Sequence, residues 1–369
     1  MEKFAEMSQE ALLPGALIPC DVLTGYLGSG KTTFLNRFLK SAEALGTAVV
    51  VNEVGEIGID QLILGEVSDN VVLLDSGCLC CSVSGTLRET LLDIAAQANR
   101  IGLPLRKVVI ETTGLAEPLP ILHALMGDRA LAARFELGRV ITTVDARLAA
   151  EQFRRRRESA RQVAVADVLV ITKSDLVDAA QVAAVEGLTV AMNPRARLID
   201  SAADDALYAA FCEASACRES ISPLQASGHP HGHGHRDHAD SRSNIHGVHE
   251  TSVGAESFWI DDETSWPGIS AWWQLVVERY GARLLRCKGI FRLRETQDVV
   301  LIQGVGTHFY PPVTLSSWPI GDARARMTVI GESLERDWLK SSLRAFQIDE
   351  AGLLPRNLNE LDLVLPLQH

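Results

Sequence analysis

The chain has 369 residues, enough for one large or two ordinary domains. Its 47 acidic residues outnumber its 35 Lys and Arg residues, and the resulting formal charge of −12 argues against nonspecific binding to nucleic acid. Hydrophobic residues make up 47% and charged residues 22% of the chain, which is typical of a folded globular protein.

The sequence also lacks features that would direct it to a membrane. No apolar run approaches the ~18 residues that a membrane-spanning helix needs. Residues 1–14 carry three Glu and one Lys and contain no hydrophobic core of a secretory signal. We therefore expect a cytoplasmic protein without a membrane partner, in which the seven cysteines are reduced thiols.

Residues 15 to about 200 alternate between short apolar strands and helices. Continuous Val and Ile runs separated by helices are typical of a parallel sheet that is covered on both faces. We therefore predict an α/β fold with a mainly parallel sheet. Its strands are expected at 18–23, 48–52, 70–74, 108–111, 140–144, 168–172 and 197–200, and helices at 32–45 and 85–99.

The composition changes between residues 220 and 254, where Gly, His, Ser, Asp and Pro dominate. Such a segment cannot bury enough apolar area to order itself, so it is interpreted as a flexible linker. After it, strands at 257–260, 284–293, 298–304 and 326–330 and helices at 266–280 and 334–346 predict a smaller α+β domain. The expected domains are therefore 15–219, 220–254 and 255–350.

A glycine-rich loop follows the first predicted strand and opens the first predicted helix. Its sequence, Gly25-Tyr-Leu-Gly-Ser-Gly-Lys-Thr32, matches the phosphate-binding pattern G-x-x-x-x-G-K-[ST]. Glycines let backbone N–H groups turn toward phosphates, Lys31 neutralises β- and γ-phosphate charge, and Thr32 is suited to ligate Mg²⁺. The motif predicts a nucleotide and Mg²⁺ site formed by Gly25, Gly28, Ser29, Gly30, Lys31 and Thr32.

A second nucleotide motif indicates which base is bound. Thr172-Lys-Ser-Asp175 follows a predicted strand and is similar to the N/T-K-x-D guanine motif. The Asp175 carboxylate can accept hydrogen bonds from guanine N1–H and N2–H₂, which adenine cannot offer, and the stem of Lys173 can lie along the base. Thr172 replaces the usual Asn. The alternative is an ordinary polar turn.

The strand at 108–111 ends in Glu111-Thr-Thr-Gly114. A carboxylate at this strand end can hold the hydration shell of Mg²⁺. Gly114 would let the backbone approach the γ-phosphate. The alternative for Glu111 is a helix cap.

Three cysteines cluster in Gly77-Cys-Leu-Cys-Cys81. Their spacing is poor for an unstrained disulfide among themselves, but thiolates suit a soft metal such as Zn²⁺. We therefore predict a metal site at Cys78, Cys80 and Cys81, with structural and redox roles as the alternatives.

Seven of the ten histidines lie between His229 and His249. Imidazoles on a flexible backbone can gather on Zn²⁺, Ni²⁺, Cu²⁺ or Co²⁺. The segment is interpreted as a metal-collecting arm, with a solvated linker as the alternative. Its densest candidate ligands are His229, His231, His233 and His235.

Five motifs together carry a resemblance to a known family. In order they are Gly25-Tyr-Leu-Gly-Ser-Gly-Lys-Thr-Thr33, Asn52-Glu-Val-Gly-Glu-Ile-Gly-Ile-Asp60, Gly77-Cys-Leu-Cys-Cys81, Glu111-Thr-Thr-Gly-Leu-Ala-Glu-Pro118 and Thr143-Val-Asp-Ala146. The chain resembles the CobW-like metal-chaperone P-loop GTPases over about residues 15–346. Leu285-Arg-Cys-Lys-Gly-Ile290 and Val329-Ile-Gly331 are similar to the second domain of that family.

The resemblance implies a P-loop GTPase fold, bound GTP and Mg²⁺, and a carried Zn²⁺ or Co²⁺ ion. It extends the nucleotide loop to Thr33 and makes Glu53 and Glu56 candidate oxygen ligands. Glu56 and Glu111 are candidate catalytic bases. Ordinary loop charges are the alternative for Glu53 and Glu56.

The predicted function is a GTP-hydrolysing metallochaperone that delivers Zn²⁺ to a client metalloprotein, with the nucleotide state controlling metal binding. One alternative keeps the GTPase but changes the cargo to cobalt or iron, for cobalamin synthesis or nitrile hydratase activation. Another is a passive zinc-storage or sensing protein. The client is not identified by the sequence, and a homo-oligomer is an open alternative to a monomer.

Overall fold

The computed structural model describes residues 17–52, 72–75, 83–101, 104–212, 253–260, 263–310, 312–315, 317–318 and 324–348. These residues form two compact units, one up to Gly254 and one from Ala255 onwards. The Gly-, His- and Ser-rich stretch predicted to be a linker lies almost entirely outside the described residues.

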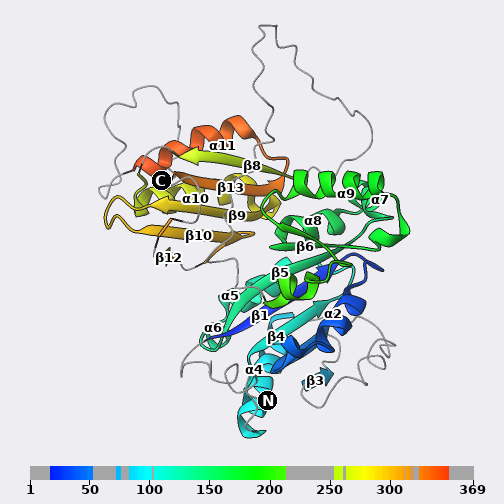
Figure 1. Ribbon diagram of the computed structural model, residues 1–369. Coiled ribbons are helices and arrows are strands. Elements are labelled where there is room, and N and C mark those ends of the chain that lie inside the picture. Colours follow the sequence, from blue (N-terminus) through cyan, green and yellow to red (C-terminus); the bar gives the residue numbers. More distant parts are fainter. Residues whose placement is uncertain are drawn as a thin grey trace. The chain divides into compact units, whose positions relative to one another are not determined.

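The first unit is built on a seven-stranded sheet whose neighbouring strands are all parallel. The strand order is β3-β2-β4-β1-β5-β6-β7, which places β1 between β4 and β5 (Figure 1). The prediction of a parallel α/β sheet is confirmed. The strands are β1 (Ile18–Gly25), β2 (Thr47–Asn52), β3 (Val72–Asp75), β4 (Lys107–Thr112), β5 (Phe135–Asp145), β6 (Val168–Thr172) and β7 (Arg197–Asp200).

Helices cover this sheet on both faces, as the alternation along β6 shows. Val168 and Val170 pack into one apolar cluster with α2 and the 208–212 segment, whereas Leu169 and Ile171 pack into another with α7 and α8. The helices are α2 (Lys31–Leu39), α4 (Val83–Ile101), α5 (Leu119–Gly127), α6 (Arg129–Ala132), α7 (Ala149–Arg155), α8 (Arg157–Val165) and α9 (Ala179–Met192), with 3₁₀ turns at Ala42–Ala44 and Ser174–Leu176 and a π-helical turn at Tyr208–Cys212.

A buried charge network ties the amino-terminal half of the sheet to that π-helical turn. The Asp21 carboxylate accepts hydrogen bonds from Lys107 Nζ at 2.6 Å and from the Arg139 backbone N–H at 2.8 Å. The two cations also donate to carbonyls of the turn: Arg139 to Ala209 and Ala210, and Lys107 to Phe211. We call these residues the Asp21 network.

The π-helical turn in turn supports α2. The Phe211 ring stacks on Phe38 and Phe34, with ring centroids 4.1 and 5.7 Å away. Because α2 begins at Lys31, this stack holds the helix that carries the phosphate loop at its amino end.

Two predicted helices differ from the structure. The helix expected at 32–45 ends at Leu39, and the chain continues through a 3₁₀ turn to Gly46, whose φ of 77° cannot continue a helix. The helix expected at 334–346 divides into α11 (Arg336–Ser342) and a 3₁₀ turn at Leu343–Gln347.

The second unit is an α+β domain, as predicted. Its six-stranded sheet has the order β11-β10-β9-β13-β8, with β12 also paired to β10, and β9 is antiparallel to both neighbours. Trp272 of α10 packs on Phe346 in its core. The elements are β8 (Val253–Ile260), α10 (Trp266–Tyr280), a 3₁₀ turn at Gly281–Arg283, β9 (Leu284–Arg292), β10 (Val299–Val305), β11 (His308–Phe309), β12 (Val313–Leu315), β13 (Ala325–Glu332), α11 and the 3₁₀ turn after it.

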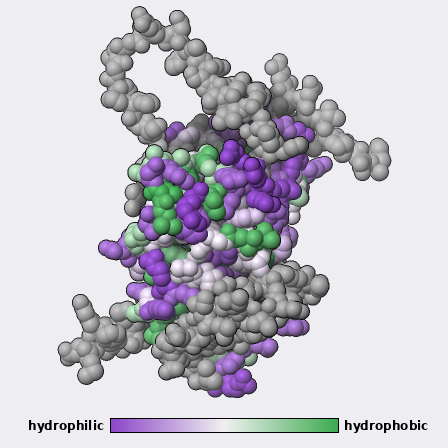
Figure 2. Space-filling model, turned by 90° about the vertical axis from the view of Figure 1, so that its right-hand side faces the viewer, coloured by the Kyte–Doolittle hydropathy of each residue, from purple (hydrophilic) through white to green (hydrophobic). Residues whose placement is uncertain are grey.

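Among the described residues, no helix combines the length and the apolar character needed to cross a membrane. Hydrophobic residues on the face seen in Figure 2 gather in small groups among hydrophilic ones. Leu27 and Leu115 are among the large hydrophobic side chains that are more than half exposed. Both belong to loops that follow the carboxyl ends of neighbouring strands.

Candidate functional site

The glycine-rich loop lies between β1 and α2, in a conformation that requires its glycines. Gly25, Gly28 and Gly30 have φ values of 141°, 71° and 90°. A Cβ on Gly25 would lie 2.5 Å from the Thr143 carbonyl oxygen. The adjacent Ser29 hydroxyl is 2.7 Å from the Thr143 hydroxyl. The loop is therefore bound closely to the end of β5.

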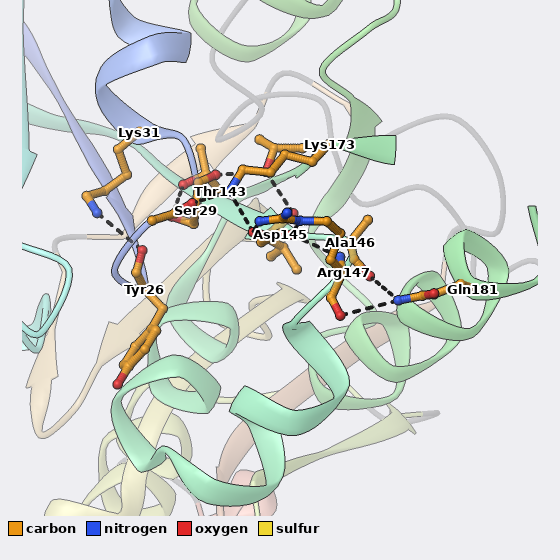
Figure 3. Close-up of polar contacts among 12 residues, drawn as sticks. Tyr26, Ser29, Lys31, Thr143, Asp145, Ala146, Arg147, Lys173 and Gln181 are labelled. Atoms are coloured by element: carbon orange, nitrogen blue, oxygen red, sulfur yellow. Dashed lines mark hydrogen bonds and ion pairs between the residues drawn. The ribbon is translucent and has the colours of Figure 1, made fainter. Parts of the chain in front are cut away.

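Lys31 is the first residue of α2, and its ammonium group turns back over the loop (Figure 3). Lys31 Nζ donates to the carbonyl oxygens of Gly25 at 3.0 Å and Tyr26 at 3.4 Å. The residue is only 9% exposed. Its positive charge is thus held inside the loop where phosphate oxygens would bind.

Thr32, the second residue of α2, contacts Glu111 near the end of β4. Thr32 Oγ1 donates to Glu111 Oε1 at 2.6 Å, and Glu111 is 4% exposed. A hydroxyl beside a buried carboxylate is the oxygen donor set that hydrated Mg²⁺ prefers in nucleotide sites. The residues present therefore fit Mg²⁺.

Gly114 lies against the phosphate loop. A Cβ at this position would be 2.6 Å from the Leu27 backbone nitrogen and 2.7 Å from Leu27 Cα. Only a glycine permits this approach of two backbones. The loop after β4 is therefore in contact with the loop after β1.

The predicted guanine motif begins at the end of β6 and is bonded to the same loop. Thr172 Oγ1 donates to the Ser29 carbonyl oxygen at 2.7 Å, and Lys173 Nζ donates to the Gly28 carbonyl oxygen at 2.6 Å. Asp175 is exposed in the following 3₁₀ turn, with no side-chain hydrogen bond to the described residues. Its carboxylate can thus accept hydrogen bonds from a ligand.

Asp145, the last residue of β5, is hydrogen-bonded to Lys173 and Arg147 (Figure 3). It is 1% exposed and accepts hydrogen bonds from Lys173 Nζ at 2.6 Å and from the Arg147 backbone N–H at 2.9 Å. Burial alone would raise the pKa of Asp145, but the hydrogen bonds from Lys173 and Arg147 outweigh it and hold that pKa below its ordinary value. The carboxylate is therefore ionised at neutral pH and keeps Lys173 in place.

The structure thus brings together the residues predicted from both nucleotide motifs, and Thr33 is exposed as the third residue of α2. The remaining predicted residues lie outside the described part of the chain. They are Glu53, Glu56, Cys78, Cys80, Cys81, His229, His231, His233 and His235. In the described ranges, no group of three or more His, Cys, Asp or Glu residues is arranged to hold a metal ion.

The strands that precede two of these groups are described: Glu53 and Glu56 follow β2 in the chain, and the three cysteines follow β3. Asn52 at the end of β2 pairs with Thr112, and Asp75 at the end of β3 pairs with Val51. Both strands therefore end at the edge of the sheet that carries Glu111 and the phosphate loop.

Sequence reasoning did not assign roles to several polar residues of this edge. Asp145 belongs to the motif Thr143-Val-Asp-Ala146, and its position directly after the apolar run 140–144 is the signal that could have marked it. Gln181 donates to the carbonyls of Ala146 and Arg147, and Gln162 donates to those of Gly114 and Ala116. Neither glutamine has a local sequence pattern that marks it.

Comparison with known proteins adds the following similarities. The family model described as "CobW/HypB/UreG, nucleotide-binding domain" matches residues 19–200, and "Cobalamin synthesis protein cobW C-terminal domain" matches residues 255–347. The chain is 30% identical over 363 residues to "Zinc chaperone CobW" of Pseudomonas aeruginosa, covering 89% of this chain and 91% of that protein. It is 36% identical over 164 residues to "Zinc chaperone YjiA" of Escherichia coli, covering 44% of this chain and 52% of that protein.

A solved structure, the Zn(II)-bound YjiA GTPase from E. coli, aligns with a TM-score of 0.65 at 23% identity. The alignment covers 90% of this chain and 99% of that one. At this level of identity it supports the fold.

Proposed function

The chain belongs to the CobW family of P-loop GTPases, and from that premise we propose that it hydrolyses GTP to control the delivery of Zn²⁺ to client metalloproteins. The contact between Thr32 and Glu111 beside the buried Lys31 carries the catalytic part of this proposal. The names of the relatives, two of them zinc chaperones, support the choice of zinc.

Hydrolysis follows from what these side chains can do. Lys31 exchanges its carbonyl partners for β- and γ-phosphate oxygens, and the glycine-rich backbone donates N–H groups to them. Thr32 and Glu111 would hold Mg²⁺, which supplies charge neutralisation on the phosphates. Because Glu111 is buried and bonded to Thr32, we assign the orientation of the attacking water to Glu56.

Guanine selectivity is assigned to Asp175, with Lys173 and Thr172 holding the turn. An Asp175→Asn variant should lose GTP hydrolysis and gain hydrolysis of xanthosine triphosphate, because an amide can donate to the 2-oxo group of xanthine. Turnover of both triphosphates is the measurement. Unchanged GTP preference in this variant would exclude Asp175 from base recognition.

The zinc site is assigned to Cys78, Cys80 and Cys81, with Glu53 as an oxygen ligand. The strand before Glu53 pairs with Glu111 through Val51, and the strand before the cysteines pairs with Val51 in turn through Asp75, so the nucleotide state can affect both segments. GTP and Mg²⁺ would favour assembly of the ligands, and preassembled thiolates bind metal more tightly. Hydrolysis would then weaken zinc binding.

A zinc titration against a chromophoric chelator tests this coupling, with GTP–Mg²⁺ or with GDP–Mg²⁺. We expect tighter zinc binding with GTP and its loss in Cys80→Ala. Cys212→Ala is the matched control, since Cys212 is a partly exposed cysteine outside the motif. Equal zinc affinity with the two nucleotides would contradict the proposal.

Thiol alkylation gives a second readout. Burial raises the pKa of Cys287 to about 12 and the pKa of Cys20 well above its usual range, so neither should react in the native protein at neutral pH. Protection by zinc therefore reports on the remaining cysteines.

Zinc-stimulated GTP turnover distinguishes a chaperone from passive storage, and the same titration with Co²⁺ tests the cobalt alternative.

We further propose the organisation 15–219, 220–254 and 255–350, with the His-rich segment as a metal-collecting arm between two domains. Deletion of residues 229–249 should lower the number of zinc ions bound while GTP hydrolysis continues. Loss of hydrolysis in this deletion would indicate a structural role.

The client is proposed to be a metalloprotein, and the oligomeric state is to be measured on the same preparations.

A further inference from the structure

Gln162 is a fully buried amide beneath the loop that follows β4. It belongs to α8 and is 0% exposed. Gln162 Nε2 donates to the carbonyl oxygens of Gly114 at 3.2 Å and Ala116 at 3.1 Å. Because both partners are carbonyl oxygens, the group facing them must be the NH₂ end of the amide.

The same helix holds this loop at a further point. Arg161 donates to the Glu117 carboxylate at 2.8 Å. The backbone carbonyl oxygen of Gln162 accepts a hydrogen bond from Thr142 Oγ1 at 2.8 Å, which joins α8 to β5. The segment from Gly114 to Glu117 is therefore attached to a helix that is itself attached to the sheet.

The choice of glutamine is unfavourable for packing alone. Gln162 Oε1 is buried and accepts no hydrogen bond from the described residues. A buried acceptor without a partner is costly, and an apolar side chain of similar size would avoid that cost. The two hydrogen bonds to the loop are what an apolar side chain could not supply.

These bonds also fix which way the loop's N–H groups point. In a trans peptide, C=O and N–H point in opposite directions. With the Gly114 carbonyl directed at Gln162, the Leu115 N–H points away from α8. Neither the Gly114 nor the Leu115 N–H has an acceptor among the described residues, and Gly114 touches the phosphate loop at Leu27.

We propose that Gln162 is a positioning residue for GTP hydrolysis, which holds the Gly114–Ala116 segment so that the Gly114 and Leu115 N–H groups can stabilise charge on the terminal phosphate. This inference rests on the proposed GTPase function. Gln162 itself does not touch the nucleotide. It acts through the backbone of Gly114 and Leu115.

The test is the Gln162→Leu variant of the full chain. We expect kcat for GTP hydrolysis to fall at least tenfold. Affinity for GDP should stay within twofold, because GDP has no terminal phosphate for the loop to meet. Gln162→Met, an apolar side chain of similar length without donors, should show the same loss and serves if the leucine variant does not fold.

Asn193→Leu is the matched control. Asn193 is 1% exposed, and its Nδ2 donates to the carbonyl oxygens of Val163, Ala164 and Ala166 at the carboxyl end of the same helix. This variant should lower the melting temperature with kcat within twofold of the parent.

The outcomes separate the hypotheses. Unchanged kcat in Gln162→Leu, or equal losses in Gln162→Leu and Asn193→Leu, would overturn the positioning role. Parallel loss of GDP and GTP affinity would overturn it too, since that indicates a structural role only. If the parent chain itself does not hydrolyse GTP, the proposed function fails rather than this inference.

Discussion

Two lysine–aspartate pairs, each with a buried carboxylate and a partly exposed lysine, have different roles in the parallel-sheet unit. Lys107 and Asp21 lie in its amino-terminal half, Lys173 and Asp145 lie at its carboxyl edge, and in both pairs the N–O distance is 2.6 Å. Their other partners differ. The first pair is bonded to the Arg139 N–H and the Phe211 carbonyl, and so holds the fold together.

The second pair is bonded to the phosphate loop, because Lys173 also donates to the Gly28 carbonyl oxygen, and Lys173 lies two residues before the exposed Asp175. The same ion-pair chemistry thus stabilises the structure in one place and prepares a binding surface in the other. Which role a pair plays depends on what else its two groups contact. Changes in the Asp21 network should therefore affect stability, and changes at the carboxyl edge should affect nucleotide binding and turnover.

The largest expected effect is that of Asp21→Ala on stability. It leaves the partly buried Lys107 ammonium and the buried Arg139 N–H without their carboxylate, and loss of one partner of such a pair costs up to about 3–5 kcal/mol of unfolding free energy. Urea denaturation measures the loss. Asp145→Ala should cost less, because Lys173 is more exposed and can be hydrated. A larger loss of unfolding free energy in Asp145→Ala than in Asp21→Ala would contradict the different roles assigned to the two pairs.

Lys31→Ala should have a large effect on catalysis and little on stability. Removing one preorganised donor to a transition-state charge typically lowers kcat about 100- to 1,000-fold. Single-turnover GTP hydrolysis measures this. Lys40→Ala, at the exposed end of the same helix, is the control and should retain activity. Turnover by Lys31→Ala close to that of the parent would remove Lys31 from the mechanism.

Thr172→Val should have a moderate effect on nucleotide affinity. It removes the hydrogen bond from β6 to the Ser29 carbonyl, which is worth about 1 kcal/mol, or roughly fivefold in Kd. Thr189→Val loses a comparable buried bond, to the Glu186 carbonyl within α9, and should change stability without changing Kd. Calorimetry of GDP binding to both variants distinguishes these results.

The smallest effect is the pH dependence due to Asp145. Because its pKa is lowered in the folded state, its contribution to stability is complete above the unfolded value of about 3.9 and is lost as the pH falls through the folded pKa. In Asp145→Asn, that part of the acid destabilisation should disappear. Melting temperatures from about pH 5 down to about pH 2 test this, and identical acid slopes in both proteins would exclude the contribution.

Local patterns predicted the parts of the structure that depend on local geometry. The glycine-rich loop is specified by its own backbone requirements, and the β strands by continuous apolar runs, so both were placed correctly from sequence. The guanine motif was located by its position after β6. Its Thr172 in place of Asn still reaches the Ser29 carbonyl.

Other parts depend on contacts between distant residues and gave no local signal. The helix predicted to reach residue 45 ends at Leu39, because Ser41 takes an extended backbone conformation. Gly46 then approaches the Pro104 carbonyl oxygen so closely that a Cβ would lie 2.7 Å from it. Asp21 reads as one polar residue within a strand, and its role emerges only when Lys107 and Arg139 are brought beside it. Gln162 likewise looks like an ordinary helical residue until the loop after β4 lies above it.

The central position of β1 has a consequence for biosynthesis. Cys20 pairs with Val108 on one side, and Gly25 pairs with Thr143 on the other. The strand that leads into the phosphate loop thus leaves the ribosome well before the two strands that it pairs with. Until β4 and β5 emerge, its apolar residues have no sheet to join, so the nascent chain should need protection from aggregation and should first bind nucleotide after β5 is complete.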